Sequence, residues 1–372
     1  MSVGWAGPNA PKPIALVRRG YSATGGAEKF LARFATEARR SGRHLILVTD
    51  RPWPEDARAG MSQTVLLGKT PWDFARSVER WRRSWGDGIV FSLERLISAD
   101  CYRAGDGVHV AWMRRRLRYD PFWQVWLRLI ARKQQHIYKL ERLCFSVEHT
   151  GAVIVNSRLV GEEVPKFFSY PQDRIHLVRN GVPENYTQGA PGKLEARRAL
   201  GLPEDAFLAA FAGTGWKRKG LRFALPAMAK AALPGSKLIV AGRGRPPSRP
   251  AADSVFLGPQ RDVRPVLAAA DVFILPTVYD PFSNACLEAL AMGRPVITTR
   301  SNGCSEILRE GVNGSVVESA NDIAGLAAAL RFWQQEGRAA AAADACRVAA
   351  AQCSLAENVR RTLEILEKIR PD

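Results

Sequence analysis

The chain has 372 residues, which is more than one ordinary hydrophobic core organises, so two domains are expected, at 1–182 and 183–372. Hydrophobic residues make up 46% and charged residues 24% of the chain, and no run of 18 apolar residues occurs. This composition is typical of a globular protein and excludes a membrane-spanning helix. The formal net charge of +18 predicts an anionic partner, which nucleic acid, an anionic membrane face or a phosphorylated substrate would each provide.

The N-terminal tail and the cysteines bear on the compartment. Residues 1–13 are rich in Gly, Pro and Ala and lack the apolar segment of a signal peptide, so the chain is expected in the cytoplasm. The six cysteines show no metal-binding spacing and are expected to be reduced and buried. No metal ion and no other cofactor is therefore expected.

The first half of the chain alternates apolar runs with helical patterns. Strands are predicted at 13–17, 44–49, 65–67 and 88–92, and helices at 28–40 and 74–85. This alternation predicts a doubly wound parallel sheet. Gly25 and Gly26 lie between the first strand and the first helix, where a backbone without side chains can approach a phosphate closely. The alternative is a plain tight turn.

Polar residues follow the fourth predicted strand. Asp100, Asp106 and His109 lie among small residues in the stretch 98–109. Beyond the carboxyl end of a strand, such side chains form a plausible site for an acceptor hydroxyl. The alternative is an ordinary loop with an Asp-Gly turn at 106–107.

The segment 111–142 mixes cations with aromatic rings. It holds nine Lys or Arg residues against two acids, and six aromatic residues are interleaved with them. That mixture is typical of the headgroup zone of an anionic membrane, and also of a surface for single-stranded nucleic acid. A third possibility is that the rings belong to the core and the cations to a solvated face. The membrane interpretation assigns lipid contacts to Arg114, Arg115, Arg116, Trp123 and Trp126.

The alternation continues along the rest of the chain. Strands are predicted at 151–156 and 175–183, then at 207–213, 236–241 and 254–258. Lys217, Arg218 and Lys219 cluster where a helix is expected to begin. The helix dipole disfavours cations there unless an anion compensates for them.

The stretch 269–298 predicts a βαβ unit. Its strand at 272–275 is stopped by Pro276, its helix spans 285–292 and ends at Gly293, and the next strand begins at Pro295. Asp280 and Glu288 bracket the loop that opens the helix. The backbone N–H groups near Ser283, Asn284 and Ala285 would be available to an anion, so the loop suits a sugar diphosphate. The alternative is ordinary helix capping.

The residue pattern of this stretch resembles the C-terminal signature of the retaining glycosyltransferases of family 4. In that signature, two glutamates with the same spacing precede "Ala-Leu-Ala-x-Gly-x-Pro-Val". This chain departs from the pattern at Asp280, which replaces the first glutamate. Further likeness lies in "Gly-Gly-Ala-Glu" at 25–28, the Asn-Gly-Val-Pro turn at 180–183 and "Arg-Lys-Gly" at 218–220. Within the family, the "Glu-Arg-x-x-Phe" run at 141–145 and the 98–106 stretch are similar to enzymes that add glucose to the lipopolysaccharide inner core.

The resemblance covers about residues 14–369 and implies the fold and the activity. It implies a GT-B fold, with two Rossmann-like domains facing each other across a cleft and a C-terminal helix that returns to the N-terminal domain. It also implies transfer of a hexose from a nucleotide diphosphate sugar, with the anomeric configuration retained, to a lipid-linked phosphorylated glycan. The expected protein is a monomer on the cytoplasmic face of the inner membrane, acting on lipopolysaccharide or on another cell-surface glycan.

The same resemblance assigns roles to residues. Arg218, Lys219 and the amides of Gly25 and Gly26 would hold the leaving diphosphate. Glu288 would bind the ribose, Asp280 the donor sugar, and Asp106 or His109 the acceptor. Two other classes of protein, a nucleic-acid-binding protein and a membrane scaffold, would explain the charge. A nucleic-acid-binding protein would not need phosphate-type loops in both halves of the chain, and a membrane scaffold would leave Asp280 and Glu288 unexplained.

Overall fold

The computed structural model describes residues 12–22, 26–246 and 253–369, and the chain divides into two compact units. The first unit comprises the chain up to Asn156, then Val160–Val178, and the residues from Ala356 onward. The second unit comprises Ser157–Leu159 and Arg179–Leu355. The C-terminal helix therefore returns to the N-terminal unit, as predicted. The tail at 1–11 and Gly25 lie outside the described residues.

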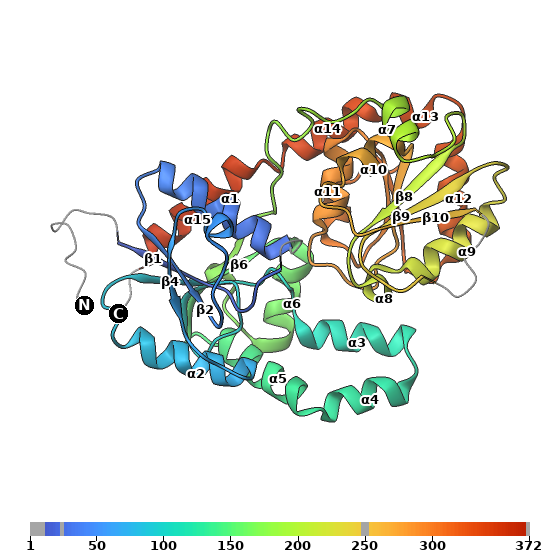
Figure 1. Ribbon diagram of the computed structural model, residues 1–372. Coiled ribbons are helices and arrows are strands. Elements are labelled where there is room, and N and C mark those ends of the chain that lie inside the picture. Colours follow the sequence, from blue (N-terminus) through green and yellow to red (C-terminus); the bar gives the residue numbers. More distant parts are fainter. Residues whose placement is uncertain (1–11, 23–25, 247–252, 370–372) are drawn as a thin grey trace. The chain divides into compact units, whose positions relative to one another are not determined.

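The first unit is built on a parallel sheet, which has seven strands in the described part of the chain (Figure 1). Their order is β3-β2-β1-β4-β5-β6-β7, so β1 lies between β2 and β4. The central strands are buried along their whole length, as expected for short apolar runs covered on both faces. The strands are β1 (Ile14–Val17), β2 (Leu45–Thr49), β3 (Ser62–Val65), β4 (Ile89–Ser92), β5 (Ala99–Arg103), β6 (Thr150–Val155) and β7 (Ile175–Leu177).

Helices connect these strands and cover the sheet. One apolar cluster packs β1, β2 and β4 against Phe74 of α2 and Leu140 of α5, and a second packs β5 and β6 against α3 and α6. The helices are α1 (Gly26–Arg40), α2 (Pro71–Arg82), α3 (His109–Tyr119), α4 (Phe122–Ile130), α5 (Arg132–Cys144), α6 (Arg158–Phe168) and α15 (Leu355–Lys368), with short 3-10 helices at Glu55–Arg58 and Gln172–Arg174. An ion pair between Arg43 and Glu367 ties α15 to the chain before β2.

The second unit has a parallel sheet of six strands within the described residues, in the order β10-β9-β8-β11-β12-β13. Its core contains all of the side chains of β8 and β11, which are buried throughout. The strands are β8 (Leu208–Ala212), β9 (Lys237–Ala241), β10 (Ser254–Gly258), β11 (Val272–Leu275), β12 (Val296–Thr299) and β13 (Gly314–Val317).

The helices of the second unit pack in pairs on this sheet. α9 contacts α12, α11 contacts α14, and α7 contacts α10. They are α7 (Lys193–Ala199), α8 (Trp216–Lys219), α9 (Leu221–Ala231), α10 (Arg264–Ala269), α11 (Asn284–Ala291), α12 (Ile323–Gln334), α13 (Arg338–Ala341) and α14 (Ala343–Ala351), with a 3-10 helix at Gly303–Ile307. Gly293 has a φ of +71° after α11, which is the glycine stop that the sequence predicts.

The structure corrects two local predictions. The stretch after the fourth strand is not a continuous loop, because Ala99–Arg103 forms β5 between β4 and β6. Lys217, Arg218 and Lys219 do not begin a long helix. They form the four-residue helix α8, which ends at Gly220, where φ is +87° and a side chain would collide with the Pro276 carbonyl oxygen.

Both sheets have a point where the strand order reverses. In the first sheet this point lies between β1 and β4, and in the second between β8 and β11. Ligands of open parallel sheets bind beyond the carboxyl ends of the strands at such points. In the second unit this position holds the loop with α8 and the loop from Thr277 to Ser283.

Candidate active site

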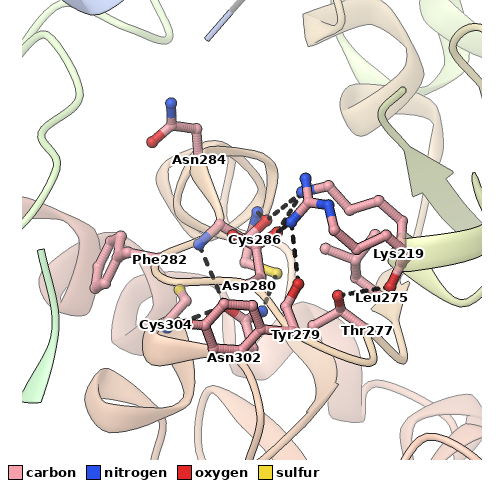
Figure 2. Close-up of polar contacts among 12 residues, drawn as sticks. Lys219, Leu275, Thr277, Tyr279, Asp280, Phe282, Asn284, Cys286, Asn302 and Cys304 are labelled. Carbon is pink, nitrogen blue, oxygen red and sulfur yellow. Dashed lines mark hydrogen bonds and ion pairs between the residues drawn. The ribbon is translucent and has the colours of Figure 1, made fainter. Parts of the chain in front are cut away.

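A buried ion pair joins the two loops at the carboxyl edge of the second sheet. The Lys219 Nζ lies 2.5 Å from the Asp280 Oδ2, and the Arg218 NH1 lies 3.5 Å from the same oxygen. Asp280 is 5% exposed and Lys219 9% exposed. The sequence-predicted cations and the first acid of the bracketing pair thus meet in one cluster, which we call the 219–280 cluster: Arg218, Lys219 and Asp280. Figure 2 shows Lys219 and Asp280 of this cluster.

Backbone contacts hold α8 against the end of β11. The Arg218 carbonyl oxygen accepts hydrogen bonds from the Val278 N–H at 2.9 Å and from the Thr277 hydroxyl at 3.0 Å. The Arg218 guanidinium donates to the Tyr279 carbonyl oxygen at 3.0 Å. Because Gly220 lets the chain pass close to Pro276, these contacts form directly after the strand ends.

The charge state of Asp280 follows from these neighbours. Burial opposes ionisation of the carboxyl group, but the charges of Lys219 and Arg218 and hydrogen bonds from Lys219 and the Phe282 N–H outweigh it. The pKa of Asp280 therefore lies below its ordinary value, and the group is a carboxylate at neutral pH. Two cations and one carboxylate leave the cluster with a net charge of +1. Arg218 carries that charge closest to solvent, since 38% of its side chain is exposed.

The helix that follows begins at this cluster. Ser283 is the N-cap of α11, and its hydroxyl accepts from the Cys286 N–H and lies 3.5 Å from the Lys219 Nζ. Asn284 accepts a hydrogen bond from the Asn180 side-chain amide at 2.7 Å. Ala285 and Glu288 are partly exposed on α11. The structure therefore places Ser283, Asn284 and Ala285 in the first turn of the helix and Glu288 one turn further along.

The residues of the first unit that were predicted to bind the acceptor lie at two different positions in the fold. Asp106 is exposed in the turn after β5, and His109 begins α3. Asp100 lies near the amino end of β5, is buried, accepts from the Val90 N–H at 2.7 Å and pairs with Arg82. Because a strand separates Asp100 from the other two residues and its carboxylate has these partners, we do not retain it as an acceptor residue.

Glu141 organises the start of α3 from another helix. It is fully buried on α5, and its two carboxylate oxygens accept from the N–H groups of His109 at 2.6 Å and Val110 at 3.1 Å. Arg95 pairs with Glu141 at 3.1 Å and donates to the Gly107 carbonyl oxygen at 2.8 Å. The pair thus positions both the turn with Asp106 and the His109 backbone. The pKa of His109 is lowered by burial and by the Arg95 charge, against Glu141 and Gln134, which favours the neutral imidazole.

Glu94 is a candidate that the sequence prediction missed. It follows β4, and its Oε1 pairs with the Arg18 NH1 at 2.6 Å; Arg18 also pairs with Glu28 on α1. Burial and the nearby Asp106 raise the pKa of Glu94 above its ordinary value, against the charge of Arg18. The sequence does place Glu94 directly after a buried strand, at the edge where the carboxyl ends of the strands meet. That position could have identified it as a candidate.

The 111–142 segment forms three packed helices, and α4 contacts both α3 and α5. One face of α4 exposes large apolar side chains, while Val125 on the other face is buried. The exposed side chains are Phe122, Trp123, Trp126, Leu127 and Ile130. No helix in the described ranges has the length and apolar character that a membrane crossing requires.

The arginines predicted to contact lipid differ in their surroundings. Arg116 is buried and pairs with Asp120 at 2.5 Å, so it is corrected from a membrane residue to a core residue. Arg115 is partly buried and pairs with Glu163 at 2.5 Å. Arg114 is exposed and lies over the Phe167 ring at 4.7 Å. The apolar face of α4 therefore includes Trp123 and Trp126, whereas Arg115 and Arg116 stabilise the helices themselves.

Known glycosyltransferases are similar in sequence to part of this chain. Residues 206–335 match the family described as glycosyl transferases group 1. An uncharacterized glycosyltransferase of Methanocaldococcus jannaschii is 30% identical over 179 residues, which are 44% of this chain and 45% of that protein. The lipopolysaccharide core biosynthesis glycosyltransferase LpsE of Rhizobium meliloti is 36% identical over 143 residues, which are 36% of this chain and 41% of that protein. The matches thus span less than half the length of these two relatives.

Longer matches come from a third relative and from solved structures. LpsD of Rhizobium meliloti, another lipopolysaccharide core biosynthesis glycosyltransferase, is 25% identical over 84% of this chain and 85% of its own length. The crystal structure of WaaG, a glycosyltransferase involved in lipopolysaccharide biosynthesis, has a TM-score of 0.80 at 20% identity, covering 95% of this chain and 99% of that one. Anabaena Alr3699/HepE in complex with UDP and glucose has a TM-score of 0.74 at 16% identity, covering 96% of this chain and 100% of that one. Residues 206–335 are thus similar to the group 1 glycosyltransferases, and the chain as a whole has the GT-B fold.

Proposed function

We propose that this chain is a retaining glycosyltransferase that moves a hexose, glucose in the first instance, from a UDP-sugar to a lipid-linked glycan such as the lipopolysaccharide inner core. The observation that carries the proposal is the 219–280 cluster beside the first turn of α11. It presents net positive charge and backbone N–H groups where a parallel sheet binds ligands, which suits a diphosphate.

The chemistry required of the protein is stabilisation of a leaving group. When the bond between the anomeric carbon and the diphosphate breaks, negative charge grows on the phosphate oxygens. Arg218 and Lys219 meet that charge, and Asp280 holds the two cations in place through its shared oxygen. Glu288 binds the ribose, Asn284 and Ala285 contribute backbone N–H groups, and Ser283 caps the helix that presents them. The departing phosphate takes the proton of the acceptor hydroxyl, so no nucleophile from the enzyme is needed.

The acceptor is assigned to the first unit. Asp106 and the neutral His109 lie beyond the carboxyl end of β5, and Glu94 follows the neighbouring strand β4. Carboxylates and a neutral imidazole accept hydrogen bonds from sugar hydroxyls, which supports a glycan acceptor at this edge. The names of LpsE, LpsD and WaaG support the lipopolysaccharide core as its source, and the complex of Alr3699/HepE supports UDP and glucose as donor components.

We further propose that the protein works as a monomer on the cytoplasmic face of an anionic membrane. The exposed aromatic and aliphatic side chains of α4 would enter the headgroup boundary, as amphipathic interfacial helices do. The cations Arg114, Arg118, Arg128, Arg132 and Lys133 are exposed on the same three helices and would meet anionic lipid. This surface favours a lipid-linked acceptor over a diffusible one.

Two measurements test the proposed function. UDP at a hundred times its Kd should stabilise the folded chain by about 2.7 kcal/mol, seen as a rise in Tm, whereas adenosine should not. Mass analysis of lipid-linked glycans from a strain that lacks the protein should show a core shortened by one hexose. An intact core with a truncated product elsewhere would move the acceptor to another cell-surface glycan. Unchanged glycans and no response to any nucleoside diphosphate would reject the transferase.

A further inference from the structure

Asn302 makes four hydrogen bonds beneath the 219–280 cluster. Its Oδ1 accepts from the backbone N–H groups of Ser283 at 3.2 Å and Cys304 at 3.1 Å. Its Nδ2 donates to the Thr298 hydroxyl at 3.0 Å and to the Cys286 sulfur at 3.3 Å. The side chain has no exposed surface, and Figure 2 labels Cys286 and Cys304 among its partners. The Asn302 side-chain amide therefore donates twice and accepts twice inside the protein, and these four bonds hold it in one orientation.

The Asn302 backbone also pairs with the loop that carries Asp280. The Asp280 N–H donates to the Ser301 carbonyl oxygen at 2.9 Å, and the Gly303 N–H donates to the Asp280 carbonyl oxygen at 2.9 Å. Asp280 and Asn302 thus form a parallel bridge just beyond the ends of β11 and β12. Residues 301–303 support the Asp280 backbone as a neighbouring strand would.

A continuous chain of contacts runs from Asn302 to the cations. Asn302 fixes the Ser283 N–H, the Ser283 hydroxyl lies 3.5 Å from the Lys219 Nζ, and the Lys219 Nζ pairs with Asp280. The bridge between Asp280 and Asn302 closes this chain into a ring. The Ser283–Lys219 contact at 3.5 Å is the longest link, and the hydrogen bond from the Ser283 N–H to Asn302 measures 3.2 Å. Because these contacts connect Asn302 to both loops, a shift of Asn302 moves both the cap of α11 and the Asp280 carboxylate.

We propose that Asn302 is a positioning residue for the diphosphate of the donor: it holds the first turn of α11 and the Asp280–Lys219 pair in the arrangement that the leaving group requires. This inference rests on the proposed function of the same site. Asn302 does not itself contact the donor, since it is fully buried. Its neutral amide supplies acceptors to two N–H groups without adding a second negative charge beside Asp280.

Asn313 provides a matched control. It is 2% exposed, its Oδ1 accepts from the Arg309 N–H at 2.6 Å, and its Nδ2 donates to the Ile307 carbonyl oxygen at 3.2 Å. It directly precedes β13 and lies at the amino end of that strand, whereas Asn302 follows the carboxyl end of β12. Asn313→Ala therefore removes a buried asparagine of the same kind from the opposite edge of the sheet.

The test compares UDP affinity by calorimetry in the unmodified full-length chain, Asn302→Ala and Asn313→Ala, at a temperature at which all three are folded. Both variants should lower Tm. Asn302→Ala should weaken UDP binding at least tenfold, and Asn313→Ala should change it less than twofold. Thr298→Val removes one of the four Asn302 partners and the hydrogen bond from the Thr298 hydroxyl to the Leu275 carbonyl oxygen, but both N–H groups stay bonded to the Asn302 Oδ1. It should therefore destabilise the fold less than Asn302→Ala and weaken UDP binding about threefold. It serves as the variant if Asn302→Ala does not fold.

A second readout needs no ligand. Brief acetylation followed by mass spectrometry reports how far Lys219 is protected by its pairing with Asp280. Asn302→Ala or Thr298→Val should raise the labelling of Lys219 severalfold relative to Lys237, and Asn313→Ala should not. Equal UDP affinity and equal Lys219 labelling in all variants would overturn the positioning role. Failure of the unmodified chain to bind UDP, with Lys219 labelling changed as expected, would instead reject the proposed function and leave Asn302 as a residue that only holds the pair.

Discussion

Lys219 and Asp280 form a buried ion pair, with their charged atoms 2.5 Å apart, although they lie 61 positions apart in the chain. The two residues come from α8 and from the loop after β11, and they meet because β8 and β11 are neighbours in the sheet. A buried pair of this kind is costly to desolvate and is weak evidence for stability alone. Its place at the carboxyl edge of the sheet indicates a functional reason for keeping it.

The first prediction concerns the coupling of this pair. Lys219→Ala leaves the Asp280 carboxylate buried with Arg218 as its nearest cation, so it should lower the free energy of unfolding by about 3 kcal/mol. The double variant Lys219→Ala/Asp280→Ala should lose about 1–3 kcal/mol less than the sum of the single losses. Urea unfolding measures all four corners of this cycle. Lys217→Ala, an exposed neighbour, should stay within about 0.5 kcal/mol, and strict additivity would show that the pair is not coupled.

The second prediction concerns pH. The pKa of Asp280 is lower in the folded chain than in the unfolded chain, so the unfolded state binds the proton more tightly. The stabilisation from Asp280 is therefore complete above its ordinary pKa of about 4 and is lost as the pH falls through the lower folded value. The difference in unfolding free energy between the unmodified chain and Asp280→Asn should be constant from pH 5 to 7 and shrink below about pH 4. Shrinkage that begins already at pH 6 would mean a raised pKa instead.

The third prediction concerns Glu141. Glu141→Ala removes the acceptor of the first two N–H groups of α3, which costs about 1 kcal/mol as a lost cap, and leaves the Arg95 charge without its buried partner, which costs several kcal/mol more. The free energy of unfolding should fall by at least about 3 kcal/mol. Glu148→Ala on the exposed end of the following turn is the control and should have little effect. A loss below about 1 kcal/mol in Glu141→Ala would remove the buried pair from the support of His109.

The sequence predicts some strands and helices accurately and misses others. The β11, α11 and β12 segments were predicted nearly to their observed ends, because short apolar runs bounded by proline and glycine carry a local signal. β5 was missed because its sequence includes Asp100 and Arg103. These charges are buried through contacts with Arg82 and over the Phe30 ring, which only the folded chain brings together.

In the candidate site, too, the sequence reveals which residues are present but not which of them pair. The presence of Lys219 and Asp280 in phosphate-type loops is visible in the sequence, but their direct pairing depends on strand order, which has no local signal. In the basic segment, sequence alone does not distinguish Arg114, which is exposed, from Arg116, which pairs with Asp120 in the core. Glu141 lies in a recognisable motif, yet its role as a cap for α3 requires the packing of α5.

The fourth prediction concerns membrane binding. Trp123→Ser with Trp126→Ser removes two exposed rings from the apolar face of α4, and affinity for vesicles containing anionic lipid should fall at least about tenfold. Leu67→Ser with Val348→Ser removes two exposed apolar side chains elsewhere and should leave vesicle affinity unchanged. Binding by the unmodified chain should also weaken with salt, because the exposed cations are screened. Vesicle flotation that does not respond to the tryptophan pair would exclude α4 as the contact surface.

The central claim is that a nucleotide diphosphate binds at the 219–280 cluster, and calorimetric titration of UDP tests it most directly. Arg218 is the exposed cation of the cluster, so Arg218→Ala should weaken UDP binding by at least about tenfold, equivalent to about 1.4 kcal/mol. Arg222→Ala, which removes an exposed arginine of α9 that stacks on Phe223, should leave the Kd within about twofold. Saturable UDP binding that depends on Arg218 but not on Arg222 is the predicted result, and UDP binding unaffected by Arg218→Ala would contradict the account.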